Sequence, residues 1–290
     1  MNKLIQQENL FFIKTKKQAI NYYLHFIDRK RIIVSQKKIS LDIVTDNIFI
    51  INLPSDKIKK EIIKNRLLKN NIENYKFIDG IIPTGKELIL FKEIKKDLNP
   101  LGRINYIGEL GCFLSHKKIW EKCIKENLNN CLVFEDDIFF HKNFQDILES
   151  NLQVFDEFDI VFMGSNQSIF SNKINKDINN NFKLNKNYYS CNHLIGEKNI
   201  YSYGTFGYFI KQKTIQIFLN EMNLPNFKWR TVDTFIQDTI EKYKLKSCTF
   251  YPNLVISDVS KSSIREGRDF LNFSIDRRWN LPYYDFTNFH

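Results

Sequence analysis

The chain has 290 residues, of which 43% are hydrophobic, 14% aromatic and 26% charged. Since domains usually run to about 100–200 residues, this length suits one α/β domain with additions or two small domains. The composition supports a folded core and excludes a disordered chain, a collagen-like chain and a disulfide scaffold. The 43 Lys and Arg residues outnumber the 33 Asp and Glu residues, and the net charge of +10 favours an anionic partner. Nucleic acid, an acidic membrane surface and a phosphorylated small molecule all remain open at this point.

Two features of the sequence bear on its compartment. The five cysteines include no C-x-x-C pair, and we expect them to be small core residues in a reducing cytosol. The start of the chain lacks the apolar region and cleavage site of a secretory signal, and no apolar run approaches the roughly 20 residues of a membrane-spanning helix. We therefore expect a cytoplasmic protein, with peripheral attachment to the cytoplasmic face of the inner membrane left open.

Residues 1–45 differ in character from the rest, because they mix aromatic residues with basic runs. They predict a helical N-terminal extension, in which residues 18–26 are the clearest amphipathic segment. This extension either packs on the main domain or contacts a partner or a membrane surface. The main domain is expected over residues 46–290.

The main domain opens with an apolar, β-branched run at 48–51, which predicts a strand buried on both faces. A helix over 57–70 and a short strand over 75–78 follow, and this order is typical of a nucleotide-binding α/β unit. Further strands are predicted over 131–134, 158–163, 203–210 and 247–256, and further helices over 108–126, 212–222 and 232–243. The segment 166–199 has no clear period and is predicted to be a long loop or lid over the site.

Three acidic residues, Glu135, Asp136 and Asp137, follow directly after the predicted strand at 131–134. Adjacent carboxylates repel one another and are costly to bury, and a divalent cation offsets that cost. Oxygen ligands suit Mg²⁺ or Mn²⁺, and ligands of open α/β sheets bind outside the carboxyl ends of strands. The sequence therefore predicts a metal site here, although a solvated turn would explain an acidic triplet taken alone.

The segment GELGCFLSHKKIW, residues 108–120, precedes these acids by a short turn. Glycines near a helix start allow close approach of a ligand or of another backbone. Ser115 and His116 are adjacent on the predicted helix, so at most one of them is expected to face a ligand directly. A single histidine on a helix is more often a structural residue, and that alternative stays open.

The string GELGCFLSHKKIW followed by LVFEDD resembles the signature of glycosyltransferase family 25. This family contains lipooligosaccharide galactosyltransferases, and collagen galactosyltransferases are related to it. Other segments resemble the family in the same order: IFIINLPSDKIKKEIIKNRLLKNNI, YKFIDGI, FDIVFMGS, GTFGYFIKQKTIQIFL, TVDTFIQDTIEKYKL and CTFYPNLVIS. The resemblance covers about residues 47–257 and leaves residues 1–45 and the last thirty or so residues outside it.

The resemblance implies a GT-A-like α/β fold, in which a single domain built on a mixed, mainly parallel sheet binds a nucleotide sugar. It also implies a UDP-sugar donor, with UDP-galactose expected, and an inverting transfer to a glycan acceptor that is expected to be lipid-linked. By the same resemblance, Asp137 chelates the Mn²⁺ or Mg²⁺ that bridges the diphosphate. Glu135 contacts the ribose, the metal or a metal-bound water, and Asp136 holds the turn. The metal would offset charge that develops on the leaving UDP.

Strand-end position, glycine placement and the resemblance together assign the remaining donor contacts. The residues expected near the uridine, the diphosphate or the acids are Asn52, Leu53, Asp79, Gly80, Gly111, Ser115 and His116. Arg265, in the segment 262–265, is expected to close over the diphosphate on the argument of charge alone.

An inverting transfer needs a base that takes the proton from the acceptor hydroxyl. Asp233 matches the family's Val-Asp at the start of a late helix and is the expected base. Capping and the helix dipole explain an acid at this position equally well. Asp238 is the second candidate.

The sequence departs from the family pattern at two places. The basic residues after the Asn-Leu turn are lysines (Lys57, Lys59 and Lys60), and Phe206-Gly207 replaces the small residues usual after Gly-Thr. These departures weaken the prediction of which donor and acceptor are used more than the prediction of the reaction class.

Three other functions compete with transfer to a glycan. A metal-dependent nucleotide-sugar hydrolase or nucleotidyltransferase would use the same acids. An inactive binding protein is disfavoured by the intact Glu135 and Asp137. A nucleic-acid-binding protein is disfavoured because the basic residues are dispersed and three acids occupy the predicted pocket, so we expect no nucleic-acid partner.

Overall fold

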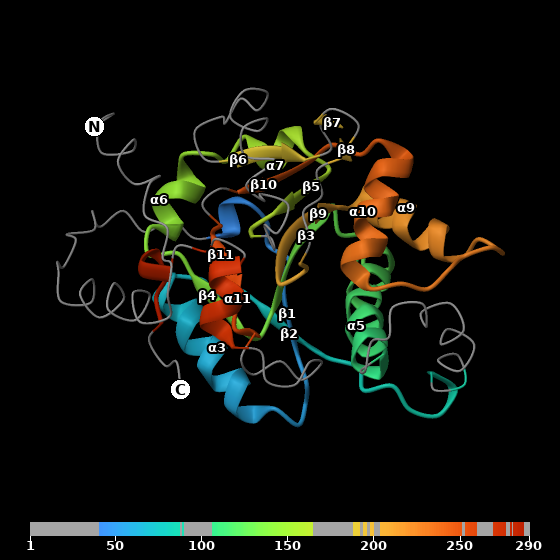
Figure 1. Cartoon of the computed structure of the whole chain (residues 1–290), viewed down its shortest axis with the longest axis horizontal. Helices are drawn as coiled ribbons and strands as arrows, with labels where there is room; N and C mark the ends of the chain where they lie inside the picture. The colour runs from blue at the N-terminus through green and yellow to red at the C-terminus, as the bar shows by residue number, and fades with distance from the viewer. Residues whose placement is uncertain are drawn as a thin grey trace.

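The computed structural model, drawn in Figure 1, describes residues 41–87, 89, 106–164, 188–191, 194–195, 198–199, 204–250, 253–259, 269–276, 279 and 281–286. The predicted amphipathic segment 18–26 and Arg265 lie outside these residues, as does most of the predicted lid at 166–199. A 3-10 turn at Leu41–Ile43 leads into the main domain, and the side chain of Leu41 is buried in its core.

A seven-stranded sheet, in the order β2-β1-β3-β9-β5-β10-β6, forms the centre of the domain. Its strands are β1 (Ile48–Asn52), β2 (Lys76–Asp79), β3 (Asn130–Glu135), β5 (Ile160–Phe162), β6 (Tyr188–Cys191), β9 (Gly207–Lys211) and β10 (Ser247–Phe250). Strands β9 and β6 run opposite to the other five. The sheet is therefore mixed and mainly parallel, and this confirms the α/β class expected of a GT-A-like domain.

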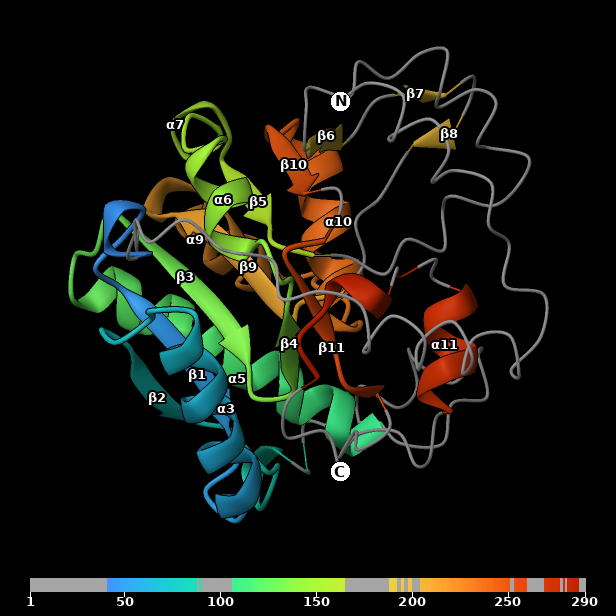
Figure 2. The ribbon, with the colours of Figure 1, turned by 90° about the vertical axis from the view of Figure 1, so that its left-hand side faces the viewer.

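Helices cover both faces of this sheet (Figure 1, Figure 2). One face carries α5 (Tyr106–Lys125), α9 (Gln212–Met222) and α10 (Val232–Tyr243). The other carries α3 (Lys57–Lys69), α6 (Phe144–Glu149), α7 (Val154–Glu157) and α11 (Phe270–Asp276), with a 3-10 turn at Leu281–Tyr283. Along β3, Cys131 and Val133 point into the core under α5, whereas Leu132 and Phe134 point into the core under α3. Because successive side chains of a strand face opposite sides, a strand covered on both faces is apolar throughout, as the sequence indicated.

Two small ribbons accompany the main sheet. Strand β4 (Ile138–Phe140) pairs antiparallel with β11 (Val255–Ser257), and β7 (Leu194–Ile195) pairs with β8 (Lys198–Asn199). The predicted single strand over 247–256 is therefore wrong, since it divides into β10 in the main sheet and β11 beside β4. The division follows from a crossing over the end of β5, where the backbone N–H groups of Leu254 and Val255 donate to the carbonyl of Met163 at 2.7 and 3.2 Å.

This crossing requires a glycine at position 164. A Cβ atom there would lie 2.0 Å from the carbonyl oxygen of Val255, far inside van der Waals contact. The segment predicted to be a loop over 166–199 also needs correction in its described part. Strand β6 forms the edge of the main sheet and pairs antiparallel with β10, and Cys191 lies opposite Ser247.

Candidate active site

The acidic triplet lies where three neighbouring strands end. In the register of the sheet, Ile51 of β1 lies opposite Glu135 of β3, and Asn52 lies opposite Asp79 of β2. Asp136 and Asp137 form the turn between β3 and β4. The strand ends that carry Asn52, Asp79 and Glu135 therefore lie side by side, while the donor contacts expected of them stay a prediction.

Asn52 connects the end of β1 to the acidic turn. Its side-chain amide donates to Asp136 Oδ2 at 2.6 Å and to the carbonyl of Asp56 at 3.2 Å. The backbone carbonyl of Asn52 accepts a hydrogen bond from the backbone N–H of Gly80 at 2.8 Å. A Cβ atom on Gly80 would lie 3.1 Å from Leu53 Cδ2, so a glycine suits this close approach. The structure brings these residues together, while the side chain of Asp79 is exposed.

Asp137 carries a carboxylate that the protein alone does not satisfy. Its Oδ1 atom is buried and has no hydrogen-bond partner among the described residues. Burial, followed by the charges of Glu135 and Asp136, raises the pKa of Asp137 well above its ordinary value. An ionised carboxylate at this position is costly unless a cation neutralises it.

Lys59 supplies part of that neutralisation from the first turn of α3. Burial would lower the pKa of Lys59, but the carboxylates of Asp136 and Asp137 outweigh this effect and raise it. Asp56 caps the same helix by accepting from the Lys59 N–H at 3.0 Å, and its Oδ2 lies 3.5 Å from Lys59 Nζ. The lysine noted as a departure from the family pattern therefore faces the acidic turn.

A fourth acid, Asp258, was not predicted. It follows β11 directly, it is buried, and its backbone N–H donates to the Asp137 carbonyl at 2.7 Å. Its charge is among those that raise the pKa of Asp137, after the effects of burial and of the acids in the triplet. A sequence signal existed, because Asp258 follows the apolar run at 254–256 as Glu135 follows the run at 131–134. Pairing of β4 with β11 then brings the two strand ends together.

The buried guanidinium of Arg66 lies near the same acids. It donates from Nη1 to the carbonyl of Ile138 at 2.9 Å, and it lies 4.0 Å from the ring centroid of Phe139. Burial lowers the pKa of Arg66, and the charges of Asp258 and Asp137 oppose that shift. Arginine remains charged in proteins, so Arg66 supports the start of β4 and offsets part of the acidic charge.

Gly111 and Ser115 hold α5 against the loop that follows β2. The Ser115 hydroxyl donates to the Gly111 carbonyl at 2.6 Å and accepts from the Ile81 N–H at 2.8 Å. A Cβ atom on Gly111 would lie 2.5 Å from the Ile81 carbonyl oxygen, so this glycine permits a backbone contact. The donor-binding role expected of both residues stays a prediction, and their observed contacts are structural.

His116 is fully buried and lies behind Glu135. Its Nδ1 atom is 3.0 Å from the Tyr208 hydroxyl, and its Nε2 atom is 3.4 Å from Glu135 Oε1. The Thr205 hydroxyl, which sequence reasoning missed, donates to the same Glu135 oxygen at 2.8 Å. Burial would raise the pKa of Glu135, but the contacts with His116 and Thr205 outweigh it and lower that pKa. Glu135 is therefore held in its ionised form.

Cys112 extends this cluster toward α10. Ligand atoms of Cys112, His116 and Glu135 all lie within 4.8 Å of one another. Burial raises the pKa of the Cys112 thiol well above its ordinary value, and the charges of Glu135 and Asp233 add to that effect. Asp233 is thus close enough to act electrostatically on the same cluster as the acidic triplet.

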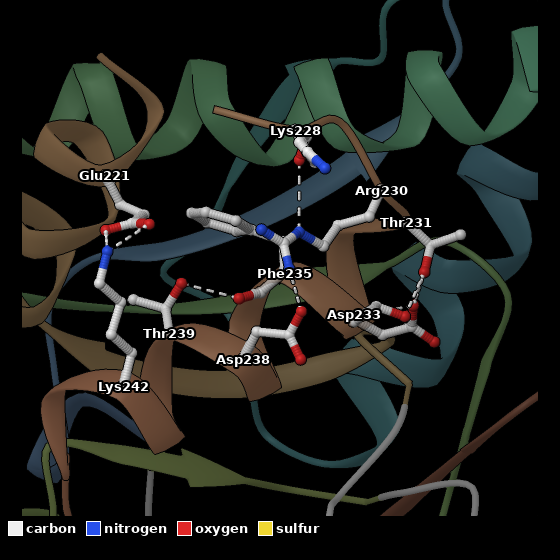
Figure 3. Close-up of polar contacts among 10 residues, drawn as sticks. Glu221, Lys228, Arg230, Thr231, Asp233, Phe235, Asp238, Thr239 and Lys242 are labelled. Atoms are coloured by element: carbon white, nitrogen blue, oxygen red, sulfur yellow. Dashed lines mark hydrogen bonds and ion pairs between the residues drawn. The ribbon is translucent and has the colours of Figure 1, made fainter. Parts of the chain in front are cut away.

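The two candidate bases have different surroundings (Figure 3). Asp233 Oδ1 accepts from the Thr231 hydroxyl and from the Thr234 N–H, the latter at 2.9 Å. Asp238 is half-exposed and forms an ion pair with Arg230. Asp238 lies five positions after Asp233, which places the two acids about 140° apart around the helix axis. Proximity to the acids therefore favours Asp233.

Residues 45–236 match the model of a family described as glycosyltransferase family 25, LPS biosynthesis protein. This chain belongs to glycosyltransferase family 25. The match includes β1, the acidic triplet and Asp233, whereas Asp258 lies beyond it.

Named relatives are similar over part or most of the chain. A Haemophilus influenzae protein, provisionally named as a glycosyltransferase, is 24% identical over 229 residues, covering 76% of this chain and 76% of that protein. Procollagen galactosyltransferase 1-A of Xenopus laevis is 28% identical over 247 residues, covering 80% of this chain and 35% of that protein. Inactive glycosyltransferase 25 family member 3 of Homo sapiens is 40% identical over 70 residues, covering 23% of this chain and 12% of that protein.

Among the described residues, no helix combines the length and the apolar character needed to span a membrane.

Proposed function

We propose that this family member is a metal-dependent, inverting glycosyltransferase that uses a UDP-sugar. The observation that carries the proposal is the buried Asp137 Oδ1, which lacks a protein partner at the carboxyl end of a central strand. The carboxylates of Glu135 and Asp137 are proposed to supply oxygen ligands, which suit Mn²⁺ or Mg²⁺. The buried Asp258 adds negative charge beside the same turn. When bound, the metal would supply positive charge to the donor diphosphate and to the leaving UDP.

Residues of the strand ends would orient the donor. Asn52 fixes Asp136 through a 2.6 Å hydrogen bond, so the acidic turn keeps one conformation while the donor binds. Lys59 adds a fixed positive charge beside the diphosphate position, since its ammonium already interacts with Asp136 and Asp137. Leu53, Asp79 and Gly80 are proposed to line the uridine side of the site.

Asp233 is proposed as the base. Its two local hydrogen bonds both engage Oδ1, so Oδ2 would accept the proton of the acceptor hydroxyl. That hydroxyl oxygen would then form its bond to the anomeric carbon as the bond to UDP breaks, which inverts the configuration. Asp238 is a weaker candidate because Arg230 already neutralises it.

The donor and acceptor are narrower proposals. Galactose from UDP-galactose is favoured because the Xenopus relative is named a procollagen galactosyltransferase. A lipooligosaccharide or another bacterial surface glycan is favoured as acceptor because the family is described by LPS biosynthesis. The net charge of +10 is compatible with a lipid-linked, phosphorylated acceptor at the cytoplasmic membrane face.

Donor binding and product formation test this proposal separately. Thermal unfolding would be followed with UDP-galactose and other nucleotide sugars, with Mn²⁺ or with EDTA, because a ligand that binds only the folded state raises Tm. We expect a Tm increase that needs both Mn²⁺ and a UDP-sugar, and its loss in Asp137→Asn but not in Asp156→Asn, an exposed control. Release of free sugar or a nucleotide-transfer product, without a glycan product, would instead identify the hydrolase or nucleotidyltransferase.

A further inference from the structure

A line of buried polar side chains reaches Glu135 from inside the protein. Trp120 Nε1 lies 3.0 Å from the Tyr208 hydroxyl, which lies 3.0 Å from His116 Nδ1. His116 Nε2 in turn lies 3.4 Å from Glu135 Oε1, an electrostatic contact, and Nε2 has no hydrogen-bond partner among the described residues. Trp120 and His116 of α5 and Tyr208 of β9 are all fully buried. We call these three residues the Trp120–Tyr208–His116 chain.

The proton positions in this chain follow from donor and acceptor capacity. An indole N–H only donates, so the Tyr208 oxygen accepts from Trp120. The Tyr208 O–H needs an acceptor, because a buried donor left without a partner loses its hydration with no compensation. His116 Nδ1 is the acceptor within reach, and a neutral imidazole that accepts at Nδ1 carries its proton on Nε2. That N–H lies on the side of Glu135.

We propose that Trp120 and Tyr208 are positioning residues that hold His116 in its Nε2–H tautomer, so that the positive end of an interior N–H dipole faces the Glu135 carboxylate at 3.4 Å. Thr205, two residues before β9, donates to the same carboxylate oxygen at 2.8 Å, so one hydrogen bond and one electrostatic contact act on the carboxylate from two segments of the chain. His116 therefore serves the donor site through Glu135 and does not touch the donor. The functional consequence rests on the proposed function, whereas the tautomer does not.

A competing occupant of this cluster is a zinc-type ion held by Cys112, His116 and Glu135. Their ligand atoms lie within 4.8 Å of one another, and thiolate, imidazole and carboxylate ligands suit Zn²⁺. Such an ion needs the Nε2 lone pair, which moves the proton to Nδ1. The Tyr208 oxygen would then accept from both Trp120 and His116, and its own proton would have no acceptor among the described residues that contact it. The Nε2–H tautomer instead gives the Tyr208 proton its acceptor and places the Nε2 proton toward a carboxylate oxygen, and on this ground we favour it over the zinc-bound form.

The tautomer can be measured directly by NMR of the imidazole nitrogens in protein labelled with ¹⁵N-histidine. The chain has five histidines, and the resonance missing from His116→Gln assigns His116. We expect a neutral Nε2–H ring in the wild type and a loss of that bias in Tyr208→Phe. Tyr243→Phe, which changes an exposed tyrosine of α10, is the matched control and should leave the spectrum of His116 unchanged. A protonated Nδ1, or a zinc-bound Nε2 with stoichiometric zinc in the purified protein, would overturn the proposal.

Activity tests the second half of the inference. His116→Gln keeps an N–H donor near the Nε2 position, whereas His116→Leu removes it. Loss of a group that orients a metal or catalytic ligand typically costs 10–100-fold in affinity or activity. We therefore expect His116→Leu to lose transferase activity by about that factor and His116→Gln to retain most of the wild-type activity. Equal losses in both folded variants would refute the positioning role. If the wild type binds no UDP-sugar, the proposed function fails while the NMR result still decides the tautomer.

Discussion

Replacing Asp137 by asparagine should stabilise the metal-free protein and abolish its metal-dependent donor binding. The pKa of Asp137 is raised in the folded state, above all by burial. The folded protein therefore holds this proton more tightly than the unfolded chain does. As pH rises above the unfolded value of about 3.9, the ionised carboxylate costs folding free energy. The variant lacks this cost at pH 7.

The size of the effect follows from the charge of the buried carboxylate, because asparagine keeps a polar atom at the Oδ1 position and removes only the ionised form. A buried polar atom without a partner costs about 1–3 kcal/mol, and a chain of this size gains roughly 2 °C in Tm per kcal/mol. Thermal unfolding in EDTA at pH 7 should therefore give Asp137→Asn a Tm about 2–6 °C above that of the wild type. The difference should shrink as the pH falls toward about 4, where the wild-type carboxyl is protonated as well.

With metal and donor bound, the wild type should instead have a higher Tm than Asp137→Asn. At 100 times the dissociation constant, a ligand stabilises the folded state by about 2.7 kcal/mol, and only the wild type would gain it. Asp156→Asn, which changes an exposed acid outside the site, should have the same Tm as the wild type in every condition. A metal-free Asp137→Asn that unfolds at or below the wild-type Tm at pH 7 would refute the reasoning that this carboxylate is uncompensated.

Three further predictions concern residues that support the site and its proposed base. Gly164→Ala should lower the free energy of unfolding, measured in urea, by at least about 3 kcal/mol, because its Cβ would lie 2.0 Å from a backbone oxygen. Gly85→Ala, at φ +52 with open space around it, is the control and should lower it by about 1–2 kcal/mol. Arg66→Met removes the positive charge near Asp137 and Asp258 and should lower the free energy of unfolding of the metal-free protein by about 3–5 kcal/mol. Mn²⁺ should restore only part of the lost stability. An unchanged free energy of unfolding would show that Arg66 does not balance the acids. Asp233→Asn should lower kcat by about 10²-fold or more with donor affinity retained, while Asp238→Asn should change kcat little; the reverse pattern would transfer the role of base to Asp238.

Local sequence patterns were sufficient for much of this fold. The helices α9 and α10 begin and end at the predicted residues, because each is a regular amphipathic stretch between strand or turn signals. The acidic triplet was recognisable because an apolar strand leads straight into it. These features depend on neighbours in the sequence and can be recognised without knowing the tertiary contacts.

Other parts of the site depend on residues that are distant in sequence. Strands β4 and β11 have three residues each, too few for a periodic signal, and only their pairing brings Asp258 to Asp137. The role of His116 likewise depends on Tyr208, 92 residues further along the chain. Ser115 could be read as a ligand contact because its hydrogen bond to Ile81 arises only when α5 packs against the loop after β2.

The pairing of β4 with β11 has a consequence for the entropy of the unfolded chain. It places Asp137 and Asp258 side by side although more than a third of the chain separates them in sequence. An ion shared by these two carboxylates would act as a removable cross-link that closes one long loop. While the ion stays bound, the closed loop lowers the entropy of the unfolded chain, so metal loading would raise the free energy of unfolding. The stability of the sheet would then depend on the supply of divalent cation as well as on its packing.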